Sequence, residues 1–143
     1  GVQTCALPIS ATMQTNPRYK NVVNEVIESL GSRIAKLRKM GVKDIIADPG
    51  FGFGKTLEHN YQLLNNLESI RTITGCNVLA GLSRKSMVWK ALQTDSKHAL
   101  NGTTALNMVA LMKGASILRV HDVKEASETI QLFQRLQASG PGQ

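Results

Sequence analysis

Residues 44–56 read DIIADPGFGFGKT, an apolar run that leads directly into a loop with three alternating glycines. The apolar residues that precede the loop predict a short buried strand over residues 42–47, with Asp48 at its carboxyl end. Glycines at this spacing suit a loop whose backbone closely approaches a ligand. The stretch therefore predicts a strand that ends in a binding loop.

Two phosphate-binding motifs are similar to this loop without matching it. The nucleotide P-loop requires G-x-x-x-x-G-K-[ST], and counting back from Gly54 puts Pro49 where its first glycine belongs. Proline has no N–H and a fixed φ, so it cannot take that place. The dinucleotide motif G-x-G-x-x-G fails because Gly50, Gly52 and Gly54 are spaced two apart. Nucleotide binding is therefore disfavoured.

The composition indicates one globular domain: 143 residues, 42% hydrophobic and 19% charged. No apolar run approaches the roughly 20 residues of a membrane span, and no secretory leader opens the sequence. We therefore expect a cytoplasmic protein without a membrane partner. The net charge of +7 comes from scattered Lys and Arg, and with 4% aromatic residues it does not favour nucleic acid. Cys5 and Cys76 have no metal or redox spacing and are interpreted as free thiols.

The rest of the chain alternates helices with strands. Apolar periodicity predicts a helix from Pro17 to Gly41 and helices over 57–70, 86–92, 102–114 and 123–136, the helix 102–114 being buried on much of its circumference. Further strands are predicted over 77–81 and 116–120. Because strands that alternate with helices are joined by right-handed crossovers, the order predicts a parallel sheet.

Polar residues gather just after each predicted strand: Asp48, then residues 83–85 (SRK), then Arg119 with residues 121–122 (HD). The carboxyl ends of parallel strands are where α/β folds bind ligands. Arg119 and His121 are two apart and share a face of the strand. Cations suit a phosphate or pyrophosphate, whereas the carboxylate suits a ring edge with paired donors. We expect a ligand that has both.

Three stretches, DPGFGFGKTLEHN (48–60), VLAGLSRKSM (78–87) and LNGTTALNMVALMKGASILRVHDVKE (100–125), resemble in order and spacing the C-terminal motifs of the dihydropteroate synthase family. The resemblance covers about residues 12–136. It implies an α/β fold, a partial TIM (β/α)8 barrel made of roughly the last three βα units with parallel strands. The implied enzyme is a transferase of folate biosynthesis and a sulfonamide target. It joins 6-hydroxymethyl-7,8-dihydropterin pyrophosphate to p-aminobenzoate, giving 7,8-dihydropteroate and pyrophosphate.

The resemblance also implies a role for each matching residue. Asp48 would hold the amino group and ring N–H edge of the pterin, and Lys85 would bond the pterin and line the p-aminobenzoate side. Arg119 would pack on the pterin and, with His121, hold the pyrophosphate. Lys85, Arg119 and His121 are thus the implied catalytic residues, because cations stabilise the departing anion.

Four further residues are expected to bind substrate: Phe53, Gly81, Ser83 and Arg84, of which all but the glycine would shape the p-aminobenzoate and sulfonamide region. No metal ligand is expected among these residues. The family implies Mg²⁺, whose protein ligand would lie in the N-terminal part that has no counterpart here, and the intact enzyme is expected to be a homodimer.

The sequence departs from the family in length. A barrel of this class takes about 250 residues, whereas three strands are predicted here. We expect residues 1–10 (GVQTCALPIS) to be a non-native leader, residues 11–138 to be the barrel part and residues 139–143 a disordered tail. Three strands cannot close a barrel, so the chain alone is expected to be inactive.

Other interpretations stay open. A pterin-binding barrel of the methyltetrahydrofolate methyltransferase type would share Asp48. A non-enzymatic fragment or a P-loop-like nucleotide binder would not catalyse the condensation. Lys55 is interpreted as an exposed loop charge, and His121 could cap the following helix. His59 and His98 are expected to do no chemistry.

Overall fold

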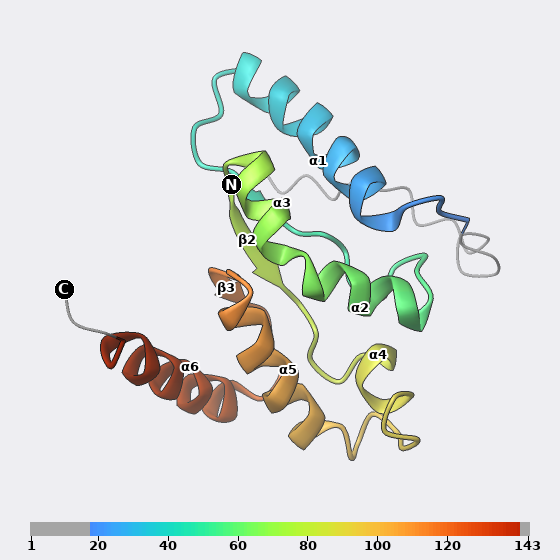
Figure 1. Cartoon of the computed structure of the whole chain (residues 1–143), viewed down its shortest axis with the longest axis vertical. Coiled ribbons are helices and arrows are strands. Elements are labelled where there is room, and N and C mark those ends of the chain that lie inside the picture. The colour runs from blue at the N-terminus through green and yellow to red at the C-terminus, as the bar shows by residue number, and fades with distance from the viewer. Residues whose placement is uncertain (1–17, 141–143) are drawn as a thin grey trace.

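The computed structural model describes residues 18–140, which form an α/β arrangement of six helices and three strands. In chain order the elements are α1 (Val22–Lys39), β1 (Ile46–Ala47), α2 (Leu57–Asn65), α3 (Leu67–Thr74), β2 (Asn77–Ala80), α4 (Ser86–Trp89), α5 (Leu100–Met112), β3 (Ile117–Leu118) and α6 (Val123–Ala138) (Figure 1). The predicted alternation of helices and strands is confirmed.

The three strands form one parallel sheet in the order β1-β2-β3, as the sequence predicts. Ala47 of β1 pairs with Val78 of β2, and Ala80 of β2 pairs with Leu118 of β3. Each outer strand is two residues long, shorter than predicted. Among the described residues, β1 and β3 each pair with β2 alone.

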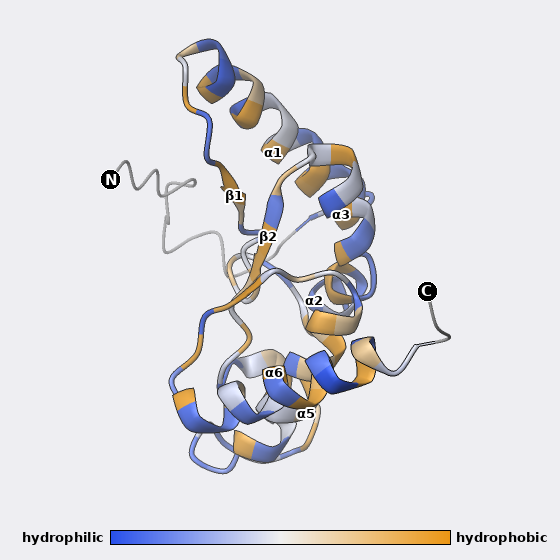
Figure 2. Ribbon diagram, turned by 90° about the vertical axis from the view of Figure 1, so that its left-hand side faces the viewer, coloured by the Kyte–Doolittle hydropathy of each residue, from blue (hydrophilic) through white to orange (hydrophobic). Residues whose placement is uncertain are grey.

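Helices α1 and α3 lie to the same side of β1 and β2 (Figure 2). The side chains between them form the core, in which Leu63, Leu67, Ile70 and Val78 are fully buried. Ile46 is 53% exposed although it belongs to a strand, because consecutive strand residues point to opposite faces of the sheet. The helices therefore bury one face of the sheet.

The helix predicted over residues 57–70 is instead two helices that meet at Asn66. The Nδ2 of Asn66 donates to the Gln62 carbonyl at 2.8 Å, and local side-chain bonds of this kind compete with helix continuation. Helix α2 begins with a capping box, in which Thr56 and His59 exchange side-chain bonds with each other's backbone N–H. His59 thus has a structural role.

Helix α5 is fully or partly buried around most of its circumference, and within it only Asn101, Ala105 and Met112 are exposed. Its buried residues are Thr103, Asn107, Ala110 and Leu111, and Met112 is 61% exposed. The helix packs on α4 and α6. The broad burial expected from its apolar composition is therefore confirmed for Leu100–Met112.

The predicted ends of the chain lie largely outside the described residues. The expected leader, residues 1–10, and Pro17 belong to the segment that is not described. In the expected tail, Ser139 donates its N–H to the Arg135 carbonyl at 3.2 Å and closes α6. No helix among residues 18–140 is long and apolar enough to cross a membrane.

Candidate functional site

The carboxyl edge of the sheet brings Asp48 and Arg119 together from the two outer strands. Nη2 of Arg119 lies 3.1 Å from Oδ2 of Asp48, and the two side chains are 55% and 33% exposed. The other carboxylate oxygen of Asp48 accepts the Gly50 N–H at 2.8 Å. Asp48 therefore has one oxygen fixed by its own loop and one that faces a half-exposed cation. A ligand that reaches this edge meets both charges.

Gly81, at the end of β2, lies directly beneath this ion pair. A Cβ atom placed on Gly81 would come within 2.8 Å of Nη2 and 3.1 Å of Nε of Arg119. Only a residue without a side chain allows the guanidinium to lie against the backbone here. Gly81 therefore sets the position of Arg119.

Lys85 extends over the glycine loop from the start of α4. Its Nζ donates to the Phe51 carbonyl at 2.6 Å and lies 4.9 Å from the centroid of the Phe53 ring. Burial lowers the pKa of Lys85; the Asp48 carboxylate opposes this shift and Arg119 adds to it. Phe53 itself is 41% exposed. The ammonium is thus held by protein on one side, close to the Asp48 and Arg119 charges.

The glycine loop folds back on itself around Lys55. Gly50, Gly52 and Gly54 all have positive φ, at 73°, 83° and 57°. Nζ of Lys55 donates to the Gly50 carbonyl at 2.9 Å and to the Phe53 carbonyl at 3.1 Å. The interpretation of Lys55 as an exposed loop charge is therefore wrong, because the turn directs two carbonyls at its ammonium.

The pKa of Lys55, which lies close to the site, is shifted from its ordinary value. Burial lowers its pKa, Asp48 opposes that shift, and Lys85 adds to it. Phe51, which follows Gly50, is fully buried and packs in the core. The loop is thus anchored by one apolar side chain and one ammonium.

Asn60 is a loop-bracing residue that the sequence interpretation did not single out. It is 2% exposed; its Oδ1 accepts the Gly52 N–H at 2.7 Å and its Nδ2 donates to the Thr56 carbonyl at 2.6 Å. A signal was present in the sequence. Asn60 stands three residues before Leu63 and four before Leu64, which places a polar side chain on the buried face of α2.

Ser83 and His121 form a pair at the same edge. The buried Ser83 hydroxyl oxygen accepts the backbone N–H of His121 at 3.1 Å and lies 2.9 Å from its Nδ1. His121 does not cap the next helix, because α6 begins after Asp122. The Ser83 hydroxyl is thus engaged with His121, whose side chain is exposed.

Arg84 is bound within the protein rather than free for a ligand. Its Nε and Nη2 grip the Asp122 carboxylate at 2.9 and 2.8 Å, and its Nη1 donates to the carbonyls of Ser96 and Lys97 at 3.1 and 2.9 Å. Its φ of 52° lies in the left-handed region. The hydrogen bond from Arg84 holds the pKa of Asp122 below its ordinary value. We infer that Arg84 supports the site by joining three loops, and the direct substrate contact expected above stays a prediction.

Replacing Arg84 with Ala should lower the melting temperature of the full-length protein at neutral pH. The loss should shrink as the pH falls through the depressed pKa of Asp122, since the pair stabilises the fold only while that carboxylate is charged. Thermal unfolding from pH 7 down to acid measures this. Lys124→Ala is the control, because its contact with Glu128 is 4.0 Å long and exposed. Equal melting temperatures for the two variants at neutral pH would contradict the clamp.

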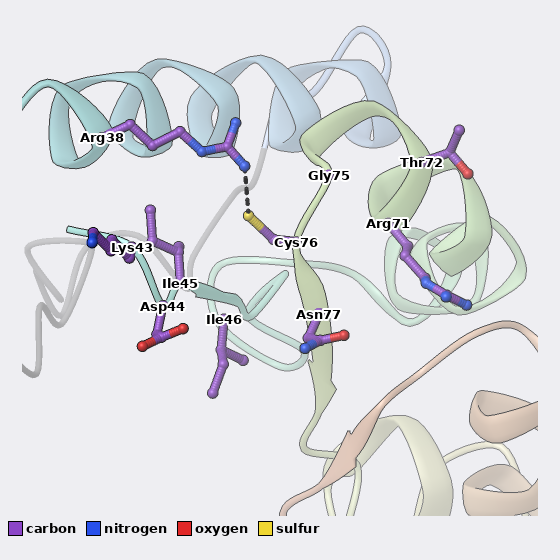
Figure 3. Close-up of a pocket in the computed structure, with 10 residues that line it drawn as sticks. All are labelled: Arg38, Lys43, Asp44, Ile45, Ile46, Arg71, Thr72, Gly75, Cys76 and Asn77. Atoms are coloured by element: carbon purple, nitrogen blue, oxygen red, sulfur yellow. Dashed lines mark hydrogen bonds between the residues drawn. The ribbon is translucent and has the colours of Figure 1, made fainter. Parts of the chain in front are cut away.

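A recess of ≈ 700 Å³ lies at the opposite, amino-terminal edge of the sheet (Figure 3). Its lining comes from the segment before β1, from the turn before β2, and from α1 and α3: Arg38, Lys43, Asp44, Ile45, Ile46, Arg71, Thr72, Gly75, Cys76 and Asn77. Arg38 reaches the Cys76 sulfur at 3.7 Å. None of the predicted site residues lines this recess, so the candidate site is the carboxyl edge.

The described residues do not fit a Mg²⁺ site by themselves. Across residues 18–140, no three His, Cys, Asp or Glu side chains come together in a way that could hold a metal ion. Asp48, the carboxylate at the site, is already shared between Arg119 and its own loop. The expectation of Mg²⁺ therefore concerns residues outside this chain and stays a prediction.

Most of this chain matches one family of known proteins. The family model described as "Pterin binding enzyme" matches residues 1–121. A dihydropteroate synthase from Haemophilus influenzae is 46% identical over 125 residues, covering 86% of this chain and 45% of that protein.

Solved structures agree with this match. Dihydropteroate synthase from Thermus thermophilus superposes with a TM-score of 0.84 at 40% identity, covering 89% of this chain and 51% of that one. The Xanthomonas albilineans dihydropteroate synthase in complex with 7,8-dihydropteroate gives 0.82 at 36% identity, covering 87% and 48%. The chain thus spans about half the length of the proteins it matches.

Proposed function

Because this chain belongs to the pterin-binding enzyme family, we propose that it is the C-terminal part of a dihydropteroate synthase. The whole enzyme would condense 6-hydroxymethyl-7,8-dihydropterin pyrophosphate with p-aminobenzoate and release pyrophosphate. The observation that carries the proposal is the cluster of Asp48, Lys85 and Arg119 at one sheet edge. The names of the similar proteins favour the synthase over the methyltransferase alternative.

Asp48 suits the pterin ring edge. A carboxylate accepts hydrogen bonds only, and the pterin presents an amino group and a ring N–H side by side. One oxygen of Asp48 is fixed by Gly50 and the other by Arg119, so the carboxylate has a defined orientation before any ligand arrives. In the proposed complex the pterin edge takes the place of the Arg119 contact, and the guanidinium turns to the ring face and the pyrophosphate.

The cations suit the leaving group. In the proposed reaction the C–O bond to the pyrophosphate breaks, the pterin methylene carries positive charge, and the amine nitrogen of p-aminobenzoate forms the new C–N bond and loses a proton. Arg119 and His121 would hold the departing pyrophosphate, since a guanidinium and an imidazolium pair well with phosphate oxygens. Arg119 becomes free for this role once the pterin edge replaces it on Asp48, and a cation at the leaving group stabilises the developing anion.

Lys85 and Phe53 would form the p-aminobenzoate side. The ammonium and the ring lie 4.9 Å apart, and the exposed ring offers an apolar wall for a flat substrate. Ser83 would also line this side, while its hydroxyl is bonded to His121 of the pyrophosphate side. A sulfonamide, which shares the shape of p-aminobenzoate, would compete for this side. A Yersinia pestis relative has been solved with a sulfonamide drug.

The intact enzyme is proposed to be a cytoplasmic homodimer that uses Mg²⁺ with residues outside this chain. Exposed apolar side chains on α6 support self-association: Leu132 is 65% and Leu136 54% exposed. Light scattering of the full-length protein measures the oligomeric state, and a monomer at all concentrations would contradict the dimer.

The proposed activity is tested with the full-length protein. Dihydropteroate is separated by chromatography after incubation with both substrates and Mg²⁺, and each substrate is omitted in turn. The proposal predicts product only when both are present. Absence of product from a folded, full-length protein would contradict the function.

Gly81→Ala should weaken binding of the pterin pyrophosphate about tenfold while hardly changing the melting temperature. The added Cβ would meet Arg119 at 2.8 Å, so the guanidinium could no longer lie against the backbone of the carboxyl edge, from which it would reach the pterin ring and the pyrophosphate. A displaced group of this kind costs about 1–3 kcal/mol in binding. Calorimetry measures the affinity, with Gly31→Ala as the control because nothing lies within 4 Å of a Cβ there. Unchanged affinity would show that Arg119 is not placed by Gly81.

A further inference from the structure

We propose that Asn60 is a positioning residue that holds Lys85 in place through Gly52. Asn60 lies on α2 and touches neither Asp48 nor Arg119 by any hydrogen bond among residues 18–140. Its effect on the site therefore has to pass through the loop. The inference rests on the proposed function for its kinetic test and on the structure alone for its labelling test.

The first step runs from Asn60 to Gly52. The Gly52 N–H donates to Oδ1 of Asn60 at 2.7 Å, and Nδ2 of Asn60 donates to the Thr56 carbonyl at 2.6 Å. One amide thus binds two points of the loop from its buried side. Because Asn60 is 2% exposed, water cannot readily replace either bond, and loss of the side chain leaves an N–H unsatisfied.

The second step runs from Gly52 to Lys85. A Cβ on Gly52 would lie 3.3 Å from Cδ and 3.9 Å from Cε of Lys85, so the lysine stem packs directly on this glycine. The φ of Gly52 is 83°, a conformation that side-chain-bearing residues rarely adopt. Gly52 is therefore held by Asn60 on one side and supports Lys85 on the other.

The third step fixes the end of the lysine. The residues on either side of Gly52 supply the Phe51 carbonyl, 2.6 Å from Nζ, and the Phe53 ring, 4.9 Å away. The Phe51 carbonyl belongs to the same planar peptide as the Gly52 N–H, so a rotation of this peptide turns the carbonyl away from the ammonium. The position of the ammonium thus depends on the one N–H that Asn60 accepts, and small displacements of a reacting group slow catalysis strongly.

The kinetic test is a double-mutant cycle in the full-length enzyme, with Asn60→Leu, Lys85→Ala and the combination. Leu has nearly the same shape as Asn and makes neither hydrogen bond. We expect Asn60→Leu to lower kcat/KM for p-aminobenzoate about 10- to 100-fold. In the Lys85→Ala background the same change should cost less than about twofold. Independent, multiplicative losses would overturn the proposal.

The labelling test does not depend on the reaction. An amine-reactive reagent is applied briefly, and modification of each lysine is followed by mass spectrometry. Asn60→Leu should speed the labelling of Lys85 several-fold and leave the exposed Lys90 unchanged. Equal labelling of Lys85 in the variant and the wild type would overturn the proposal even if the enzyme is active. Missing dihydropteroate formation in the wild type would count against the proposed function alone.

Loss of stability is separated from loss of position by two further variants. Ile70→Val trims a fully buried side chain on α3 that belongs to the core and has no polar atom with which to bond the loop. It should cost about 1 kcal/mol of stability with no change in Lys85 labelling. If Asn60→Leu does not fold, Asn60→Ala enters both tests in its place, because it also lacks an acceptor for the Gly52 N–H. Asn60→Asp, whose carboxylate still accepts that N–H, should label Lys85 at nearly the wild-type rate. Faster Lys85 labelling in Ile70→Val would show that the effect reports stability and would overturn the proposal.

Discussion

Replacing Asp48 with Asn in the full-length enzyme should weaken binding of the pterin pyrophosphate at least about tenfold. The carboxylate accepts from two donors at once, whereas the amide offers one acceptor and one donor, so one ligand N–H loses its partner at a cost of about 1–3 kcal/mol. The amide oxygen can still accept the Gly50 N–H, now 2.8 Å from Oδ1, so the loop should keep its shape. The loss therefore reports the ligand contact.

Calorimetric titration with the pterin pyrophosphate measures this effect. Asp44→Asn is the matched control, because Asp44 is an exposed carboxylate that lines the recess at the other edge of the sheet. The Asp48–Arg119 pair is partly exposed, so its loss should hardly change the melting temperature. Equal affinities for Asp48→Asn and the wild type would remove Asp48 from the pterin site.

Arg119→Ala should lower kcat about 100-fold or more and weaken binding of both the pterin and the pyrophosphate. The guanidinium can stack on a ring and donate to phosphate oxygens at the same time, and a lost donor to a developing anion costs about 10²- to 10³-fold in turnover. Arg119 lies at the end of β3 against Gly81, whereas Lys55 and Lys85 are bonded to carbonyls of the glycine loop, so neither lysine stands in for it.

Lys85→Ala gives the contrasting result. Because its ammonium lies over the Phe53 ring, its loss should mainly raise the KM for p-aminobenzoate and slow condensation. Steady-state kinetics with each substrate varied in turn separates the two variants, and Arg135→Ala on the exposed part of α6 is the control. Normal turnover in both Arg119→Ala and Lys85→Ala would mean that the pocket lies elsewhere.

The sequence predicts the parallel βα framework because hydrophobic periodicity and glycine spacing are local signals. Asp48 and Arg119 belong to strands that do not pair with each other, yet the rule that ligands bind at the carboxyl ends of parallel strands places both at one edge. The break at Asn66 was not predictable from the apolar pattern, since the leucines continue in register through it. A local side-chain bond decides that feature.

The parts that sequence analysis missed depend on which partner a polar group finds. Lys55 looks like a solvated charge until the loop directs two carbonyls at it. Arg84 sits beside Lys85 in the sequence, but its left-handed φ of 52° turns its guanidinium toward Asp122. Two neighbouring residues of one motif thus have different partners: Lys85 binds the glycine loop at the site, and Arg84 binds Asp122.

A crystal structure of the full-length enzyme with the pterin pyrophosphate bound tests the central claim most directly. The proposal predicts the pterin ring edge on the Asp48 carboxylate, the ring against Arg119 and Lys85, and the pyrophosphate beside Arg119 and His121. A pterin bound elsewhere, with the 3.1 Å contact between Asp48 and Arg119 unchanged, would contradict it.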